Sequence, residues 1–170
     1  MRRLGLLAAL AATAVTVLAA LASSGSAQSG ERTIVLTQPA GAFYLVDQPP
    51  RMRRRDNAFS PGDQLISAHR LVDAAKHAAG RLELVCTAVS LSRSIYSAGF
   101  LCTGVAHLAD GDLFLGARFR PSRGYFAGTV RGALTGGTAA YAGARGTFIS
   151  TPGVPSRRRV PSTYTFHILP

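Results

Sequence analysis

The amino-acid sequence predicts an all-β fold in which eight antiparallel strands form a barrel or a sandwich. Short apolar or β-branched segments recur along the chain, and turn residues such as Asp110-Gly111 separate them. No convincing long helix follows the first thirty residues. A closed arrangement is favoured, because closing an antiparallel meander removes its exposed strand edges.

The first expected strand, residues 32–38 (RTIVLTQ), is rich in β-branched residues. A proline- and arginine-rich segment follows it up to Gly62, and a loop of this length is uncommon in a compact domain. The periodicity of the next segment would also suit a short helix, but we interpret it as a strand. The seven further strands are expected at residues 63–74, 81–91, 98–110, 112–120, 125–136, 143–151 and 162–169.

Residues 1–27 have the features of a secretory signal peptide, with two arginines, an apolar run and small residues before a cleavage position after Ala27. An uncleaved membrane anchor is the alternative, because the run from Leu4 to Ala22 is nearly long enough to span a bilayer. We expect cleavage and a secreted, extracellular protein. The remaining chain then comprises a strand and a long basic loop (28–62) and the rest of a single barrel domain (63–170).

The chain is strongly basic, with a formal net charge of +11, which loss of Arg2 and Arg3 would reduce to about +9. Arginines cluster in two expected loops, at Arg51, Arg53, Arg54 and Arg55 and at Arg157, Arg158 and Arg159. Such clusters can contact an anionic surface. No aromatic residues interleave with them, and export argues against an intracellular role, so no nucleic-acid partner is expected.

The segment Gly132–Phe148 (GALTGGTAAYAGARGTF) holds five glycines in seventeen residues. A phosphate-binding loop would need a lysine and a following helix, and a flexible linker would not carry regularly spaced apolar residues. We therefore expect a shaped reversal between two strands, with Tyr141 covering one end of the core. Its structural turn residues would be Gly136, Gly137, Gly143, Arg145 and Gly146.

Within this segment, LTGGTAAYAGARGTF resembles the glycine signature "TGGTG-x-x-x-x-ARG" of dirigent proteins and the allene oxide cyclase barrel superfamily. Gly62-Asp63 and AGRLELVCTAVS resemble further segments of plant allene oxide cyclases, so that the match covers about residues 59–148. Ala139 stands where the signature has a glycine. The resemblance implies an eight-stranded antiparallel β-barrel with a mostly apolar lumen, preceded here by the signal peptide.

Proteins of this kind act mainly by holding a reactive substrate in one conformation, which requires apolar walls and few polar groups. We expect a cavity of at least about 300 Å³ that binds a small apolar or aromatic molecule. It would guide cyclisation or stereoselective coupling, as an isomerase- or dirigent-like enzyme of secondary metabolism. The alternative is a non-catalytic extracellular or envelope-associated module whose lumen its own side chains fill. No cofactor is expected, and the sequence allows an oligomer.

Few residues are candidates for the site. The first strand lacks the glutamate and asparagine that the cyclases place at their pocket, and Gln38 and Tyr141 are the candidate ligand contacts. The resemblance adds two catalytic candidates. Asp63 belongs to the shared signature, although a turn acceptor is its simpler role, and Arg131 lies about one residue from a dirigent arginine. No metal site is expected, because the four histidines lack metal-binding spacing.

Cys86 and Cys102 lie at equal distances from Ser94, the expected midpoint of a hairpin. A turn centred there places the two cysteines directly opposite each other, with Leu84 opposite Gly104 and Ala88 opposite Phe100. In an oxidising compartment, this arrangement predicts a disulfide. The alternative is a free Cys86 in the pocket, as its resemblance to a cyclase cysteine implies.

Overall fold

The computed structural model describes residues 30–39, 41, 43–48, 59–90, 98–121, 128–153 and 161–169. Nine antiparallel strands account for most of them. They are β1 (Arg32–Gln38), β2 (Tyr44–Val46), β3 (Gln64–Val72), β4 (Ala78–Ala88), β5 (Phe100–Leu108), β6 (Gly111–Phe119), β7 (Val130–Gly137), β8 (Arg145–Pro152) and β9 (Ser162–Leu169). A short 3-10 turn, η3 (Ala139–Tyr141), connects β7 to β8.

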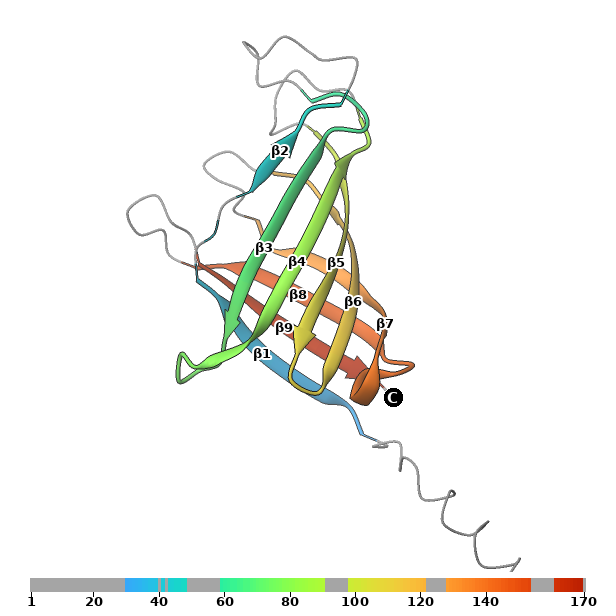
Figure 1. The fold of residues 1–170 in the computed structure, drawn as a ribbon. Helices are drawn as coiled ribbons and strands as arrows, with labels where there is room; N and C mark the ends of the chain where they lie inside the picture. Colours follow the sequence, from blue (N-terminus) through green and yellow to red (C-terminus); the bar gives the residue numbers. More distant parts are fainter. Residues whose placement is uncertain are drawn as a thin grey trace, which may run out of the picture.

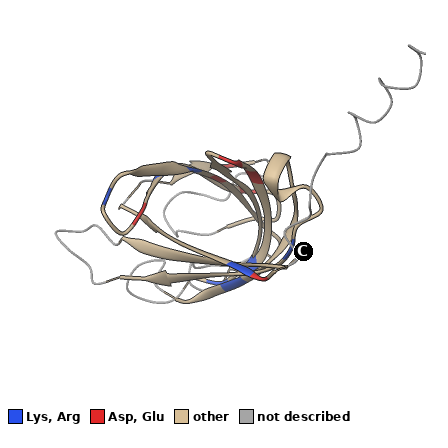
Figure 2. Ribbon diagram, turned by 90° about the horizontal axis from the view of Figure 1, so that it is seen from below, with Lys and Arg blue, Asp and Glu red and all other residues tan. Residues whose placement is uncertain are grey.

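The strands follow the order β1-β9-β8-β7-β6-β5-β4-β3-β2, and β1 also pairs with β3. This last pairing, of Thr37 with Val72, closes an eight-stranded barrel. Figure 1 shows the closed arrangement, and Figure 2 shows the strands curving around the interior when the barrel is viewed from below. The prediction of an eight-stranded antiparallel barrel is confirmed, and the sandwich alternative is wrong.

The ninth strand, β2, was not predicted. It pairs with β3 outside the closed ring, and it lies within the segment that we expected to be a loop. Three residues between proline-rich stretches are too few to produce a recognisable alternation of apolar and polar residues.

The register of the β4–β5 hairpin agrees with the sequence prediction. Cys86 lies opposite Cys102, as the symmetry about the hairpin midpoint requires. The two flanking pairs, Leu84 with Gly104 and Ala88 with Phe100, are also as expected. Ser94 itself lies outside the described residues.

Alternate residues of the strands point into the barrel and form two buried apolar clusters. The larger core cluster consists of Leu36, Leu71, Leu82, Ala106, Leu113, Leu115, Leu134, Tyr141, Ala144, Phe148, Tyr164, Phe166 and Ile168. The smaller core cluster consists of Phe59, Leu65, Cys86, Ala88, Ala98 and Phe100. In the smaller cluster the rings of Phe59 and Phe100 meet edge to face, with centroids 5.2 Å apart.

The glycine-rich segment reverses the chain between β7 and β8. A Cβ atom on Gly137 would lie 2.5 Å from two backbone carbonyl oxygens, so this position has no room for a side chain. Ala139 adopts a φ of 49°, a left-handed conformation that residues other than glycine rarely adopt. The residue that replaces the glycine of the signature therefore keeps a glycine-like backbone.

Several predictions concern residues outside the described part of the chain. These are the signal peptide (1–27), both arginine clusters (Arg51–Arg55 and Arg157–Arg159) and most of the connections expected between strands at 92–97 and 121–124. Among the residues that the structure does describe, no helix is long and apolar enough to cross a membrane.

Candidate functional site

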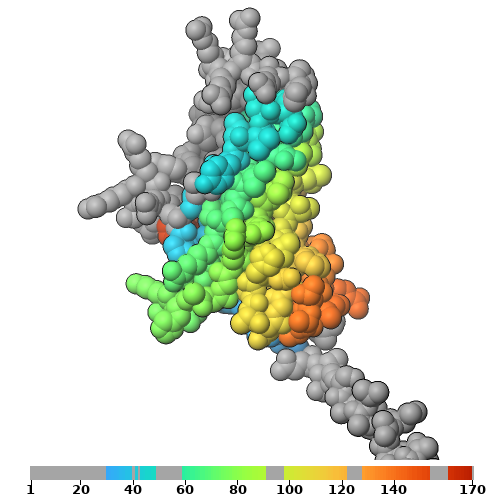
Figure 3. Space-filling model, viewed as in Figure 1, coloured from blue at the N-terminus to red at the C-terminus, as the bar shows by residue number. Residues whose placement is uncertain are grey.

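A cavity of about 380 Å³ lies inside the barrel. Its lining comes from β1, from β4 to β9, and from Gly41 and Phe43 in the segment between β1 and β2. It borders both core clusters, because Phe148 and Tyr164 belong to the larger one and Cys86 to the smaller. The volume exceeds the expected minimum, so side chains of the barrel do not fill the lumen. The space-filling view in Figure 3 shows that atoms cover the outer face of β3 to β6.

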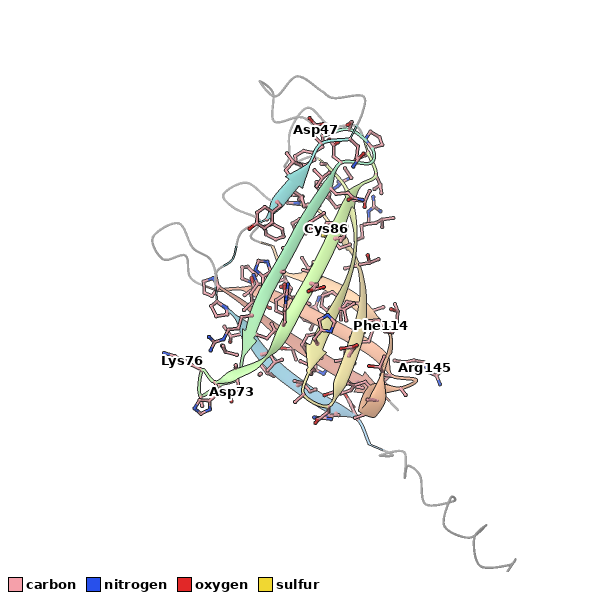
Figure 4. All side chains as sticks on the ribbon, in the orientation of Figure 1. Asp47, Asp73, Lys76, Cys86, Phe114 and Arg145 are labelled. Carbon is pink, nitrogen blue, oxygen red and sulfur yellow. A yellow bond between two sulfur atoms is a disulfide. The ribbon has the colours of Figure 1, made fainter. Side chains whose placement is uncertain are left out.

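One wall of the cavity is apolar. Leu84, Ala117 and Phe119 line it together with the disulfide. The Cys86–Cys102 bridge joins neighbouring strands, with an S–S distance of 2.06 Å (Figure 4 labels Cys86 on β4). The predicted disulfide is confirmed, and a free Cys86 is wrong, because the bridge contains both cysteines of the chain.

The opposite wall carries a stripe of four polar residues, Gln38, Ser162, Tyr164 and Ser150, which we call the polar stripe. The strand registers align them, because Gln38 lies opposite Ser162 on the β1–β9 pair and Tyr164 lies opposite Ser150 on the β9–β8 pair. Of the two predicted ligand contacts, Gln38 therefore lines the cavity. Its side chain is largely buried, and the residue is only 6% exposed.

Tyr164 is buried in this stripe, and its ring stacks on that of Phe166. Burial raises the pKa of the Tyr164 phenol above its usual value, and a hydrogen bond from Ser150 partly offsets this rise. The phenol is therefore protonated at neutral pH. No charged side chain is found among the described residues that line the cavity.

The other predicted site residues lie away from the cavity. Tyr141 is buried under the Arg32 guanidinium, which lies 5.4 Å from its ring centroid. Asp63 is buried and accepts hydrogen bonds from the backbone N–H groups of Gln48 and Ser60, at 2.9 and 2.8 Å. Arg131 is exposed on β7. The structure thus gives Asp63 the turn-acceptor role and brings neither catalytic candidate to the cavity lining.

Two buried polar residues of β3 were missed by the sequence analysis. Ser67 and His69 alternate with apolar residues on the inner face of the strand, and Ser67 Oγ and His69 Nε2 have no hydrogen-bond partner among the residues that the structure describes. Both lie beside the cavity, because Ser67 is opposite Leu84 and the His69 ring contacts Phe43 at 5.7 Å between centroids. Burial lowers the pKa of His69 below its usual value of 6.5, which keeps the imidazole neutral.

The described residues contain no group of three histidine, cysteine, aspartate or glutamate side chains that could hold a metal ion. On the outside of the barrel, the ring of His107 on β5 lies between two carboxylates, with Nδ1 2.8 Å from Asp112 Oδ1 and Nε2 3.8 Å from Glu83 Oε2.

Solved structures of the same fold are found over most of the chain. A pyocyanin demethylase is 20% identical, with a TM-score of 0.58, and the alignment covers 81% of this chain and 99% of that one. A pterocarpan synthase dirigent protein is 14% identical, with a TM-score of 0.59 and coverages of 82% and 83%. A Diels–Alderase from Streptomyces koyangensis is 14% identical, with a TM-score of 0.56 and coverages of 90% and 74%.

At these identities the likeness shows a common fold. The barrel is that of dirigent proteins and of cyclase barrels, as the sequence resemblance implied. No family model and no curated protein matches the sequence.

Proposed function

We propose that this chain is a secreted barrel that holds a small, uncharged, mostly apolar or aromatic molecule in its lumen and guides its cyclisation or coupling. The cavity of about 380 Å³ carries this proposal. Its volume lies within the range of sites for small organic molecules, which are mostly apolar and contain few polar groups. One apolar wall and one polar stripe fit that description.

Guidance of this kind needs no dedicated acid or base. Confining a flexible molecule to a reactive conformation lowers the entropic part of the barrier, and this contribution can be large. Barrels of the same fold include a pterocarpan synthase dirigent protein and a cyclase that catalyses [4 + 2] cycloaddition. Their activities support guided cyclisation or coupling as the proposed function of this chain.

A second candidate function is binding without catalysis. Two observations favour it: both residues proposed as catalytic lie away from the cavity lining, and no charged side chain is found among the described lining residues. The two candidates share the ligand site and differ only in whether the bound molecule reacts.

The ligand site can be tested by filling the cavity. Ala117→Leu adds a larger side chain at the apolar wall, whereas Arg118→Leu adds the same side chain at the next residue, which is exposed. N-phenyl-1-naphthylamine, an uncharged aromatic dye, serves as the probe. We expect saturable fluorescence enhancement with the wild type and with Arg118→Leu, and affinity at least about tenfold weaker with Ala117→Leu, because a blocked site loses its apolar contacts.

Equal binding by all three proteins would mean that the dye binds outside the cavity, and absence of saturable binding to the wild type would overturn the ligand site.

The proposed export is tested separately. Protein secreted from a host cell should begin near Gln28 by intact-mass analysis, and membrane-bound protein that keeps its N-terminal segment would contradict it.

A further inference from the structure

The polar stripe contains two hydroxyl groups on neighbouring strands. Tyr164 and Ser150 lie opposite each other on β9 and β8, so their side chains are on the same face of the sheet. Because both residues line the cavity, these two side chains lie at its wall. The stacking of the Tyr164 ring on Phe166 restricts the direction of its hydroxyl group.

The two hydroxyl groups have at least one hydrogen-bond donor that they cannot use between themselves. Each has one donor and can also accept, and two neighbouring hydroxyl groups share at most one hydrogen bond. Where the Ser150 hydroxyl donates to Tyr164 Oη, the phenolic O–H is the donor that remains. Burial keeps the pKa of the phenol above its usual value, so this O–H remains in place at neutral pH.

The occupant that fits this donor is an oxygen acceptor in an uncharged molecule. A carbonyl oxygen accepts a hydrogen bond and brings no donor that would need a partner of its own. A carboxylate would lose its hydration in a cavity where the described lining offers no cation, and an unpaired buried charge is strongly disfavoured.

We propose that Tyr164, positioned by Ser150, is the specificity-determining residue of the lumen, and that it donates a hydrogen bond to the carbonyl oxygen of an uncharged aromatic ketone. The assignment rests on the proposed function, because it requires that the cavity bind an aromatic molecule. The apolar wall opposite, formed by Leu84, Phe119 and the disulfide, would then contact the aromatic part of the ligand.

Three probes of similar shape test the assignment. 2-Acetylnaphthalene carries a carbonyl group, 2-ethylnaphthalene replaces it with a methylene group, and 2-naphthoate replaces the ketone with a carboxylate. Their dissociation constants are measured at neutral pH by displacement of N-phenyl-1-naphthylamine. We expect the ketone to bind about five- to tenfold more tightly than the hydrocarbon, as one neutral hydrogen bond provides. The carboxylate should bind most weakly.

Tyr164→Phe should abolish the preference for the ketone while leaving the affinity for 2-ethylnaphthalene within about twofold. Ser150→Ala should reduce the preference in part. Tyr141→Phe is the matched control, because it removes a hydroxyl group from a buried tyrosine that does not line the cavity, and the preference should persist. The ratio of the two affinities is the readout, since a purely structural defect would weaken both probes together.

Two outcomes overturn the assignment and can be told apart. If ketone and hydrocarbon bind the wild type equally, or if Tyr164→Phe retains the ketone preference, the cavity binds aromatic molecules without the proposed hydrogen bond. If none of the probes binds the wild type, the proposed function fails and the role of Tyr164 fails with it.

Discussion

Reduction of the Cys86–Cys102 disulfide should lower the free energy of unfolding substantially. The bridged cysteines are 16 residues apart in the sequence. In the chain-entropy model, a cross-link that closes a loop of this size restricts the unfolded chain by about 3 kcal/mol. This is a large share of the free energy of unfolding of a folded domain, which is typically about 5 to 15 kcal/mol.

Urea denaturation of the oxidised and the reduced protein measures this difference. Circular dichroism and tyrosine fluorescence are suitable signals, because the chain has no tryptophan. The reduced protein keeps both side chains, so the difference reports the cross-link and includes little change in packing. Its unfolded state is more expanded, and the slope of the unfolding free energy against urea should therefore increase.

A double variant, Cys86→Ala with Cys102→Ala, provides the control. It should lose the same contribution and an additional amount for lost packing, because Cys86 is only 5% exposed, and it should not respond to the reductant. A difference of less than about 1 kcal/mol between oxidised and reduced wild type would refute the reasoning, since it would mean that the bridge hardly restricts the unfolded chain.

Three further predictions concern single residues. Ala139→Gly should raise the unfolding free energy by up to about 1 kcal/mol, because glycine adopts the left-handed conformation of this position without strain. Ala140→Gly, at the next residue, should lower the unfolding free energy by a similar amount, and a loss of stability in Ala139→Gly would contradict the reasoning. Gly137→Ala should lower the unfolding free energy by more than about 2 kcal/mol, because the new Cβ meets two backbone oxygens. Gly128→Ala, whose new Cβ would meet no described atom within 4 Å, should change it by less than about 0.5 kcal/mol, and equal effects of the two substitutions would refute the close approach. Since burial lowers the folded-state pKa of His69, the unfolded chain binds the proton more readily, and the unfolding free energy should fall as the pH drops below 6.5. Denaturation at several pH values should show a weaker pH dependence in His69→Phe, and an unchanged dependence would exclude His69 as its cause.

The strands and the disulfide could be predicted because they depend on local patterns. β1 was predicted with its observed bounds, and a symmetrical hairpin fixes which residues face each other, so the Cys86–Cys102 pairing followed from spacing. Gln38 could be named from its place at the end of this strand. Its contact with the cavity also depends on the pairing of β1 with β9, which are separated by most of the chain.

The rest of the site depends on registers that no local pattern determines. The alternation in STYTFHIL is compatible with Tyr164 facing inward, but the position of Ser150 opposite it depends on how β8 and β9 pair across the segment after residue 153. The sequence did not indicate a role for His69 for a related reason. That its Nε2 has no hydrogen-bond partner among the described residues is a property of the packed interior. Arg131 is an example of the opposite error. Its spacing in the sequence suggested a catalytic role, but the residue is exposed on β7 and does not line the cavity.

The closure of the barrel has a consequence for its motions. The paired residues of β1 and β9 extend along seven positions, whereas in the described part of the chain β1 pairs with β3 only at Thr37 and Val72. The polar stripe on β1, β9 and β8 is therefore joined to the β3 side by a narrow seam. Amide hydrogens beside this seam should exchange with solvent at a lower free energy of opening than those in the centre of the β4–β5 hairpin, which the disulfide holds together. Opening along this line would widen the lumen without breaking any of the longer ladders.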